Sequence, residues 1–187
     1  MAKGKILQEA KPGDVCVLHF DDPLVRSLLP LPFGVQKVLF GQTAGCDVGL
    51  VACESTHGGL GVSYRDKMVI CFLFRVEFVI PSPGLHLALN ACAAAAVATL
   101  LGVSLSQVGS CLSAFTPVKM RSELEVARNG VKIVNDVYNA NPVSSRAAID
   151  LLKSTIDCKG QKIAILGDML ELGPSWEEVL HVQQPRI

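Results

Sequence analysis

The chain has 187 residues, half of them hydrophobic, and its 17 basic residues balance 17 acidic ones. This length and composition exclude a disordered chain and allow one full domain with part of another. Because the formal net charge is zero, nothing favours nucleic acid or an anionic membrane surface as a partner.

Cysteine usage and apolar runs narrow the class further. The sequence has seven cysteines with no CxxC pair, an odd count that predicts free and mostly buried thiols in a reducing compartment. Residues 1–14 lack the apolar core of a secretory signal, so no targeting segment is visible and we expect a cytoplasmic protein. The densest apolar run, Met68–Phe74, is far shorter than the roughly 20 residues of a membrane span.

The first elements in chain order predict an α/β unit. Val15–Phe20, Val35–Gly41 and Cys46–Cys53 have the composition of short strands. Asp22 and Pro23 predict the N-cap and first position of a helix after the first strand, because proline lacks the N–H that a helix start leaves unpaired. A strand, a helix and a second strand in this order favour parallel pairing.

The stretch from His57 to Ile80 has no clear pattern. Within it, Met68–Phe74 is apolar, uncharged and rich in β-forming residues, so it would favour aggregation if exposed. We expect deletion of this run to improve solubility. His57 and His181 have no partner at metal-ligand spacing, and we expect no metal site.

Two helices are predicted in the middle of the chain. The first covers Leu85–Leu101, because its alanine run favours helix, and it ends at Gly102. Its expected apolar face consists of Leu89, Ala93, Ala96, Val97 and Leu100. Ser104, with Gln107 three residues later, predicts the capping box of a second helix, which runs to about Phe115.

A hairpin follows the second helix. Ser122–Ala127 and Val131–Val134 have the pattern of strands, and Asn129 with Gly130 predicts the turn between them because this pair tolerates positive φ.

One more helix and one more strand complete the pattern. The helix covers Val143–Ser154, with Asn141 as its N-cap and Pro142 at its first position. Gln161–Asp168 then predicts a buried strand, the first of a new α/β domain.

Hydrogen-bonding side chains gather in the segment Asn135–Pro142 (NDVYNANP), where a predicted strand gives way to a helix. Ligands of open α/β sheets bind at the carboxyl ends of strands, and an acidic side chain such as Asp136 can accept from both hydroxyls of a ribose there. The structural alternative is that Asp136 and Asn139 build a turn and Asn141 caps a helix. For the segment as a whole we favour binding.

Three more side chains are candidates for the same ligand. Arg121 precedes a strand, where a fixed guanidinium suits a phosphate, and the alternative is an ion pair with Glu123 or Glu125. His86 and Asn90 lie four residues apart on one helix face, and asparagine offers the donor and the acceptor that an adenine edge requires. The alternative for these two is a polar edge on a mostly buried helix.

The order and spacing of five motifs resemble the Mur ligase family, and within it the MurF-type branch that adds D-alanyl-D-alanine to UDP-N-acetylmuramoyl-tripeptide. The motifs are DDP at 21–23, GLHLALNACAAAA at 84–96, MRSE at 120–123, NDVYNANP at 135–142 and LGDMLELG at 166–173. The resemblance implies an α/β fold in which residues 1–141 form the second half of the central ATP-binding domain. Residues 142–187 would begin a Rossmann-like C-terminal domain.

The same resemblance implies a nucleotide site with ATP as its ligand. By it, Asp136 binds the ribose, Asn90 contacts adenine and Arg121 reaches the phosphates. The other residues that it implies at the nucleotide are His86, Tyr138, Asn139 and Asn141. It implies no catalytic residue and no metal ligand within this chain.

The family forms an acyl phosphate from a carboxylate and ATP, then an amide, with magnesium, a UDP-muramoyl peptide and D-Ala-D-Ala as further ligands. This sequence departs from the family at His19, which replaces the asparagine of N-x-D-D-P, and at Leu87, which replaces the asparagine after the motif histidine. It also has no G-x-x-x-x-G-K-[ST] phosphate loop. Compared with the family, the run Met68–Phe74 looks like an insertion.

These departures set our expectation for activity. We expect an ATP-dependent amide ligase by family that is inactive as this chain alone. The alternative is a non-catalytic nucleotide-binding or interaction module from a truncated or mis-spliced product. If the source is a plant, the plastid stroma replaces the cytoplasm as the expected compartment.

Overall fold

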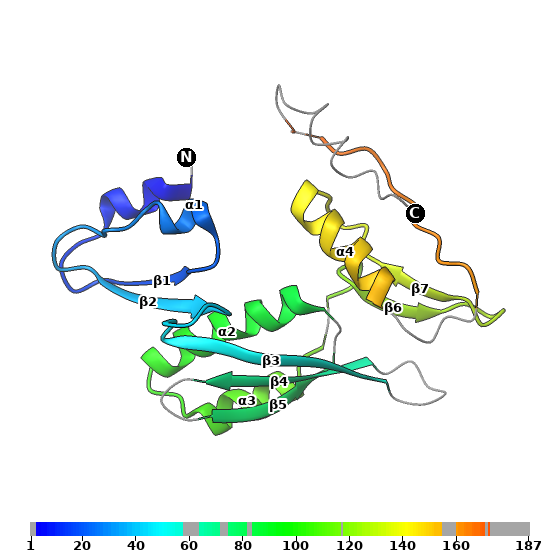
Figure 1. The fold of residues 1–187 in the computed structure, drawn as a ribbon, viewed down its shortest axis with the longest axis horizontal. Helices are drawn as coiled ribbons and strands as arrows, with labels where there is room; N and C mark the ends of the chain where they lie inside the picture. The colour runs from blue at the N-terminus through cyan, green and yellow to red at the C-terminus, as the bar shows by residue number, and fades with distance from the viewer. Residues whose placement is uncertain are drawn as a thin grey trace.

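The computed structural model describes residues 3–57, 64–71, 75–81, 84–116, 118–154, 160–170 and 172. Its strands are β1 (Val15–His19), β2 (Gln36–Gly41), β3 (Val48–His57), β4 (Tyr64–Cys71), β5 (Arg75–Ile80), β6 (Glu123–Val126) and β7 (Lys132–Asn135). Its helices are the 3-10 helix η1 (Lys3–Glu9) and α1 (Pro23–Arg26), α2 (Leu85–Leu100), α3 (Leu105–Ser113) and α4 (Pro142–Ser154). Strands β1 to β5 form one sheet in that order, and β6 and β7 form a second sheet of two strands (Figure 1). The fold is mixed α/β, as the sequence predicted.

The parallel half of the large sheet follows the predicted strands. β1 pairs with β2 and β2 with β3 in parallel, and Val17 lies opposite Val38. Asp22 caps α1, since its carboxylate accepts from two backbone N–H groups of the first turn, and Pro23 takes the first helical position. The predicted cap and the parallel pairing are both confirmed.

The antiparallel half of the large sheet contradicts the interpretation of the run Met68–Phe74 as an insertion. Met68–Cys71 belong to β4, which pairs with β3 on one side and β5 on the other, so that Val69 lies opposite both Ala52 and Glu77. A strand between two partners is an integral part of its sheet, because its backbone groups are bonded on both edges. The insertion interpretation is therefore wrong for Met68–Cys71, while Phe72–Phe74 lie outside the described residues.

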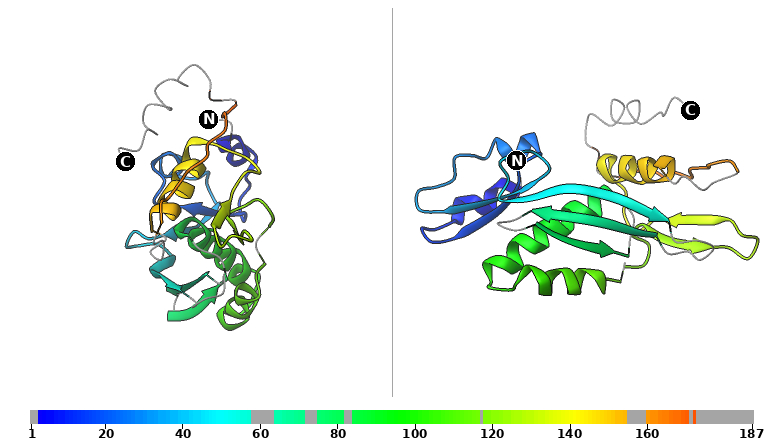
Figure 2. Two further views of the ribbon diagram at one scale, coloured as in Figure 1. Left: turned by 90° about the vertical axis from the view of Figure 1, so that its right-hand side faces the viewer. Right: turned by 60° about the horizontal axis from the view of Figure 1, so that its bottom comes forward.

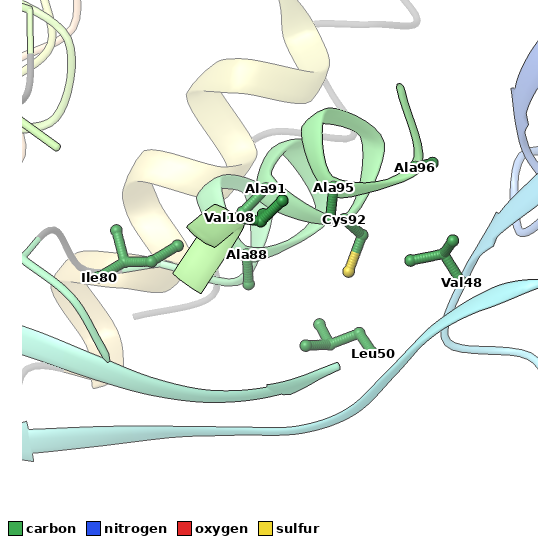
Figure 3. Packing of buried hydrophobic residues seen from close by; sticks show 9 residues of the cluster. All are labelled: Val48, Leu50, Ile80, Ala88, Ala91, Cys92, Ala95, Ala96 and Val108. Carbon is green, nitrogen blue, oxygen red and sulfur yellow. The ribbon is translucent and has the colours of Figure 1, made fainter. Parts of the chain in front are cut away.

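Helix α2 covers one face of the large sheet (Figure 2). Mostly small side chains of the helix pack against the strands. Cys92 has 0% of its surface exposed and points its sulfur towards Val48 and Leu50 (Figure 3). Burial, together with the nearby Cys46 and Cys53, raises the pKa of the Cys92 thiol to about 12. The other members of this core are Ile80, Ala88, Ala91, Ala95, Ala96 and Val108.

The apolar face predicted for this helix is wrong for two of its five residues. Ala96 is buried and Leu89 packs against the core, but Val97 and Leu100 are each 46% exposed. In a helix whose residues are nearly all apolar, hydrophobic periodicity does not select a face. Four alanines are buried instead, and small side chains of this kind allow the helix axis to approach the strands closely; they are Ala88, Ala91, Ala95 and Ala96.

The second sheet and the helix after it agree with the sequence. β6 and β7 are antiparallel, and Gly130, with a φ of +81°, takes the left-handed position in the turn between them. Ser104 and Gln107 form the predicted capping box of α3. Asn141 caps α4, because its Oδ1 accepts from the backbone N–H groups of the first turn.

The strand predicted at Gln161–Asp168 is not formed. Residues 161–168 have no regular secondary structure and are exposed, with Ile163 at 71% and Ile165 at 93%. A strand needs a neighbour to bond its backbone, and these residues pair with no strand in the described part of the chain. The tail Val179–Ile187 lies outside the described residues.

Membrane helices and cysteines complete the comparison with the sequence. Of the helices described here, none is both long and apolar enough to cross a membrane. The cysteines with described side chains form no disulfide, and they are Cys16, Cys46, Cys53, Cys92 and Cys111. Only Cys92 among them is buried, so the expectation of mostly buried thiols is wrong for this group.

Candidate functional site

Residues 120–122, which we call the corner, lie immediately before β6. Met120 and Ser122 have φ angles of +61° and +49°, in the left-handed region that non-glycine residues rarely adopt. Ser122 is only 5% exposed. Backbone strain of this kind persists where surrounding contacts hold it, and it is concentrated at binding sites.

Asp136 holds the corner from the residue that follows β7. Its Oδ1 accepts from the backbone N–H of Ser122 at 2.8 Å. Two residues later, the backbone N–H of Tyr138 donates to the carbonyl of Met120 at 3.2 Å. The second carboxylate oxygen of Asp136 has no hydrogen-bond donor among the described residues. One oxygen is therefore fixed, and the other is available to a ligand.

Arg121 projects from the corner and lies over the ring of Tyr138, with Cζ 4.3 Å from the ring centroid. Glu123 and Glu125 accept hydrogen bonds from other donors. The ion pair that the sequence offered as an alternative for Arg121 is therefore not seen among the described residues. Instead, an aromatic face supports an exposed guanidinium beside Asp136.

His86 reaches the corner from the first turn of α2. Its Nε2 lies 3.3 Å from Ser122 Oγ, a hydrogen bond whose donor depends on the histidine tautomer. Gly84 gives the ring room, because a Cβ there would lie 2.7 Å from Cε1 of His86. Asn90, one turn further along α2, is exposed and makes no hydrogen bond to the corner. The structure thus joins His86, but not Asn90, to the corner.

The remaining predicted residues follow Asp136 in the chain. Tyr138 is 59% exposed, and Asn139 is also exposed. Asn141 Oδ1 accepts from the backbone N–H of Val143 at 3.0 Å and of Ser144 at 2.9 Å. The structural reading of Asn141 as a helix cap is therefore correct for its oxygen, and its amide nitrogen is what remains for a ligand.

Two residues of this site did not stand out in the sequence. Asn135 donates from Nδ2 to Glu125 at 2.9 Å, while its Oδ1 is buried and accepts no hydrogen bond from the described residues. Ser122 joins Asp136 to His86. No composition rule distinguishes such a serine, because its role depends on a left-handed backbone and on burial.

A second polar cluster lies at the carboxyl ends of β1 and β2. Asp21 accepts from the backbone N–H groups of Gln42 at 2.6 Å and Thr43 at 3.0 Å, and from the Thr43 hydroxyl. His19 Nε2 lies 3.5 Å from Asp21, and its ring stacks on Phe40. Burial acts to raise the pKa of Asp21, but these hydrogen bonds and His19 outweigh it and lower the pKa. With its oxygens bonded within the chain, Asp21 clamps the loop after β2.

The residues at the corner fit the adenosine end of ATP better than they fit a metal ion. A fixed carboxylate with an available oxygen suits a ribose, and a supported guanidinium suits a phosphate. No group of three or more His, Cys, Asp or Glu side chains that could hold a metal is present among the described residues. We therefore derive no step through magnesium.

Several known proteins to which this chain is similar are ligases. The family described as "Mur ligase, glutamate ligase domain" matches residues 120–184, which begin at the corner. The UDP-N-acetylmuramoyl-tripeptide–D-alanyl-D-alanine ligase of Bacillus subtilis (strain 168) is 32% identical over 180 residues, covering 96% of this chain and 36% of that protein. A UDP-N-acetylmuramate–L-alanine ligase of Nitrobacter winogradskyi is 32% identical over 152 residues, 80% of this chain and 32% of that protein.

Solved structures agree with these relatives. A crystal structure of MurF from Acinetobacter baumannii superposes with a TM-score of 0.82 at 28% identity, covering 96% of this chain and 37% of that one. MurF ligase from Thermotoga maritima, solved in complex with ADP, has a TM-score of 0.78 at 26% identity, covering 95% of this chain and 38% of that one. The chain belongs to the Mur ligase family. It spans little more than a third of the length of these relatives.

Proposed function

We propose that this chain forms the adenosine-binding part of the nucleotide site of an ATP-dependent ligase in peptidoglycan precursor synthesis. The observation that supports this best is the carboxylate of Asp136, which is fixed through one oxygen by the Ser122 N–H and has its other oxygen available. The ADP bound in the Thermotoga maritima relative supports a nucleotide as the ligand. Asp136 would accept from ribose hydroxyls, Asn90 would contact adenine, and Arg121 would attract phosphates.

We further propose the MurF type of reaction, which joins D-Ala-D-Ala to a UDP-muramoyl tripeptide. Its support is the longer match to the D-alanyl-D-alanine ligase, 96% of this chain against 80% for the L-alanine ligase. Both relatives are bacterial, which gives no support to a plastid, and we propose the cytoplasm. The domain boundary that we expect at residues 141 and 142 stays a prediction.

The nucleotide proposal is tested by titrating the chain with adenosine and with ATP in a calorimeter. Asp136→Ala should weaken both ligands by about 1–3 kcal/mol, the usual cost of leaving hydrogen-bond partners unpaired. Asp150→Ala is the matched control, because Asp150 is an exposed aspartate on α4. If Asp136→Ala binds adenosine as the unaltered chain does, the ribose role is wrong.

A second candidate function is a non-catalytic nucleotide-binding or interaction module. The observation that favours it is the lack of a phosphate-loop motif in these 187 residues. The chain supplied with ATP, magnesium, UDP-muramoyl tripeptide and D-Ala-D-Ala should then release no phosphate above background. Turnover on the order of 1 per second, as in an ordinary enzyme, would instead assign catalysis to the chain itself.

A further inference from the structure

We propose that His86 and Ser122 are positioning residues that aim Asp136 at the ribose hydroxyls of the nucleotide. The inference rests on the proposed nucleotide site and goes beyond it, because neither residue is assigned this role there. It depends on two hydrogen bonds that meet at Ser122, one made by its hydroxyl and the other by its backbone N–H. His86 Nε2 lies 3.3 Å from Ser122 Oγ, and the Ser122 N–H lies 2.8 Å from Asp136 Oδ1.

The Asp136 carboxylate is held in one direction by Ser122. A half-buried carboxylate at a strand end has several rotamers, and the loss of that freedom on binding reduces affinity. The Ser122 N–H fixes Oδ1 and so restricts the direction of Oδ2. A carboxylate held in this way binds ribose hydroxyls with less ordering than a mobile one.

The Ser122 N–H is presented to Asp136 by a left-handed backbone. Ser122 has a φ of +49°, and the N–H points at Asp136 only while this unfavourable conformation is kept. The serine side chain is 5% exposed, and its hydroxyl is bonded to His86. We infer that this side-chain bond helps to hold the left-handed backbone in place.

His86 links this arrangement to helix α2. It belongs to the first turn of α2, and Gly84 leaves the space that its ring occupies. Asn90, the proposed adenine contact, lies one turn further along the same helix. The helix that carries the adenine contact is thereby linked to the carboxylate that would bind the ribose. The link sets the relative position of the two parts of the adenosine site.

A merely structural link between α2 and the corner would make a different prediction. It would change stability, and it would change the affinity for every adenine compound alike. A positioning role changes specifically the contribution of the ribose hydroxyls. The decisive quantity is therefore the ratio of the affinities for adenosine and for 2′,3′-dideoxyadenosine, which lacks the hydroxyls.

The experiment measures this ratio by calorimetric titration of the full chain, with melting temperatures recorded in parallel. The unaltered chain should prefer adenosine by about fivefold or more, and Asp136→Ala should abolish the preference. His86→Ala should reduce the preference by about twofold to tenfold, the usual size of coupling between neighbours. His86→Gln should restore much of it, since its amide reaches the region of Nε2.

Ser122→Gly is the second variant, and it decides the question if His86→Ala does not fold. Glycine adopts positive and negative φ about equally readily, so this change adds no strain but removes the hydroxyl that holds the backbone at a φ of +49°. Its preference for adenosine should fall as in His86→Ala. An unchanged ratio in a folded His86→Ala or Ser122→Gly variant would overturn the positioning role alone. Absence of any preference in the unaltered chain would overturn the ribose role of Asp136, and the positioning role with it.

Discussion

The guanidinium of Arg121 lies over the ring of Tyr138, with Cζ 4.3 Å from the ring centroid. This contact restricts the arginine without neutralising it, so its charge remains available to an anion. Tyr138 in turn is tied to the corner, because its backbone N–H donates to Met120. The cation is therefore presented within a few residues of the carboxylate proposed for the ribose.

Arg121→Ala should weaken ATP binding by about 1 kcal/mol or more, roughly fivefold, and should leave adenosine binding unchanged. The reason is that only ATP offers phosphate oxygens to the guanidinium. Calorimetric titration with both ligands measures the difference. Arg128→Ala, which removes an exposed arginine in the turn after β6, is the matched control. Equal losses for ATP and adenosine would show that Arg121 supports the fold and not the phosphates.

Asp21→Asn should destabilise the chain at neutral pH by about 1–3 kcal/mol, because a charged acceptor of three hydrogen bonds is lost. The pKa of Asp21 is lowered from 3.8 in the folded chain, so its contribution is present above that value and is lost as the pH falls below it. Urea unfolding at about pH 7 and about pH 3 should thus give a difference that shrinks in acid. Asp150→Asn is the control. A difference that stays constant with pH would rule out the charge as its cause.

Val69→Pro should unfold the large sheet, since proline removes a ladder hydrogen bond from a strand with partners on both sides. The expected loss is about 3 kcal/mol or more in the free energy of unfolding. Gln161→Pro is the control, because residue 161 is exposed and lies outside any strand. Deletion of Met68–Phe74 should likewise abolish the cooperative transition. A soluble, cooperatively folded deletion variant would return the run to its interpretation as an insertion.

Asn141→Ala should lower stability by about 1 kcal/mol, because the cap of α4 is lost. Asn141→Asp keeps the capping oxygens and should retain the stability, as measured by urea unfolding. The same aspartate would repel phosphates if the nucleotide lies close. A loss of ATP affinity without a loss of adenosine affinity in Asn141→Asp would therefore favour a place for residue 141 beside the phosphates.

The helix ends of this chain were predictable from residues close together in the sequence. The strands were harder to predict, because a strand also needs a partner. The caps at Asp22, Ser104 and Asn141 were predictable because a cap is decided within four residues. The strand β4 was misread although its partners β3 and β5 are its neighbours in the chain, because its apolar run lacks the alternation that is typical of a strand. A strand was predicted at Gln161–Asp168 but is not formed. Its apolar pattern needs a neighbouring strand, which the described residues do not supply.

Some residues of the candidate site were likewise predictable from the sequence, and others were not. Asp136 was a candidate because polar residues are concentrated at a strand end, and Arg121 was a candidate because it immediately precedes a strand. Ser122 was missed, since its importance comes from a φ of +49° and from a partner 36 positions away, His86. Composition does not report backbone handedness or distant contacts, so the connecting residues of a site are the hardest to predict.

The buried Cys92 thiol can report on opening motions of the chain through its rate of alkylation. Alkylating reagents react with the thiolate, and a thiol with a pKa of about 12 and no exposed surface is almost inert towards them. The exposed Cys111 should react at once under the same conditions. The slow modification of Cys92 then reports how often α2 lifts from the sheet, and a ligand that binds across α2 and the corner should slow it further.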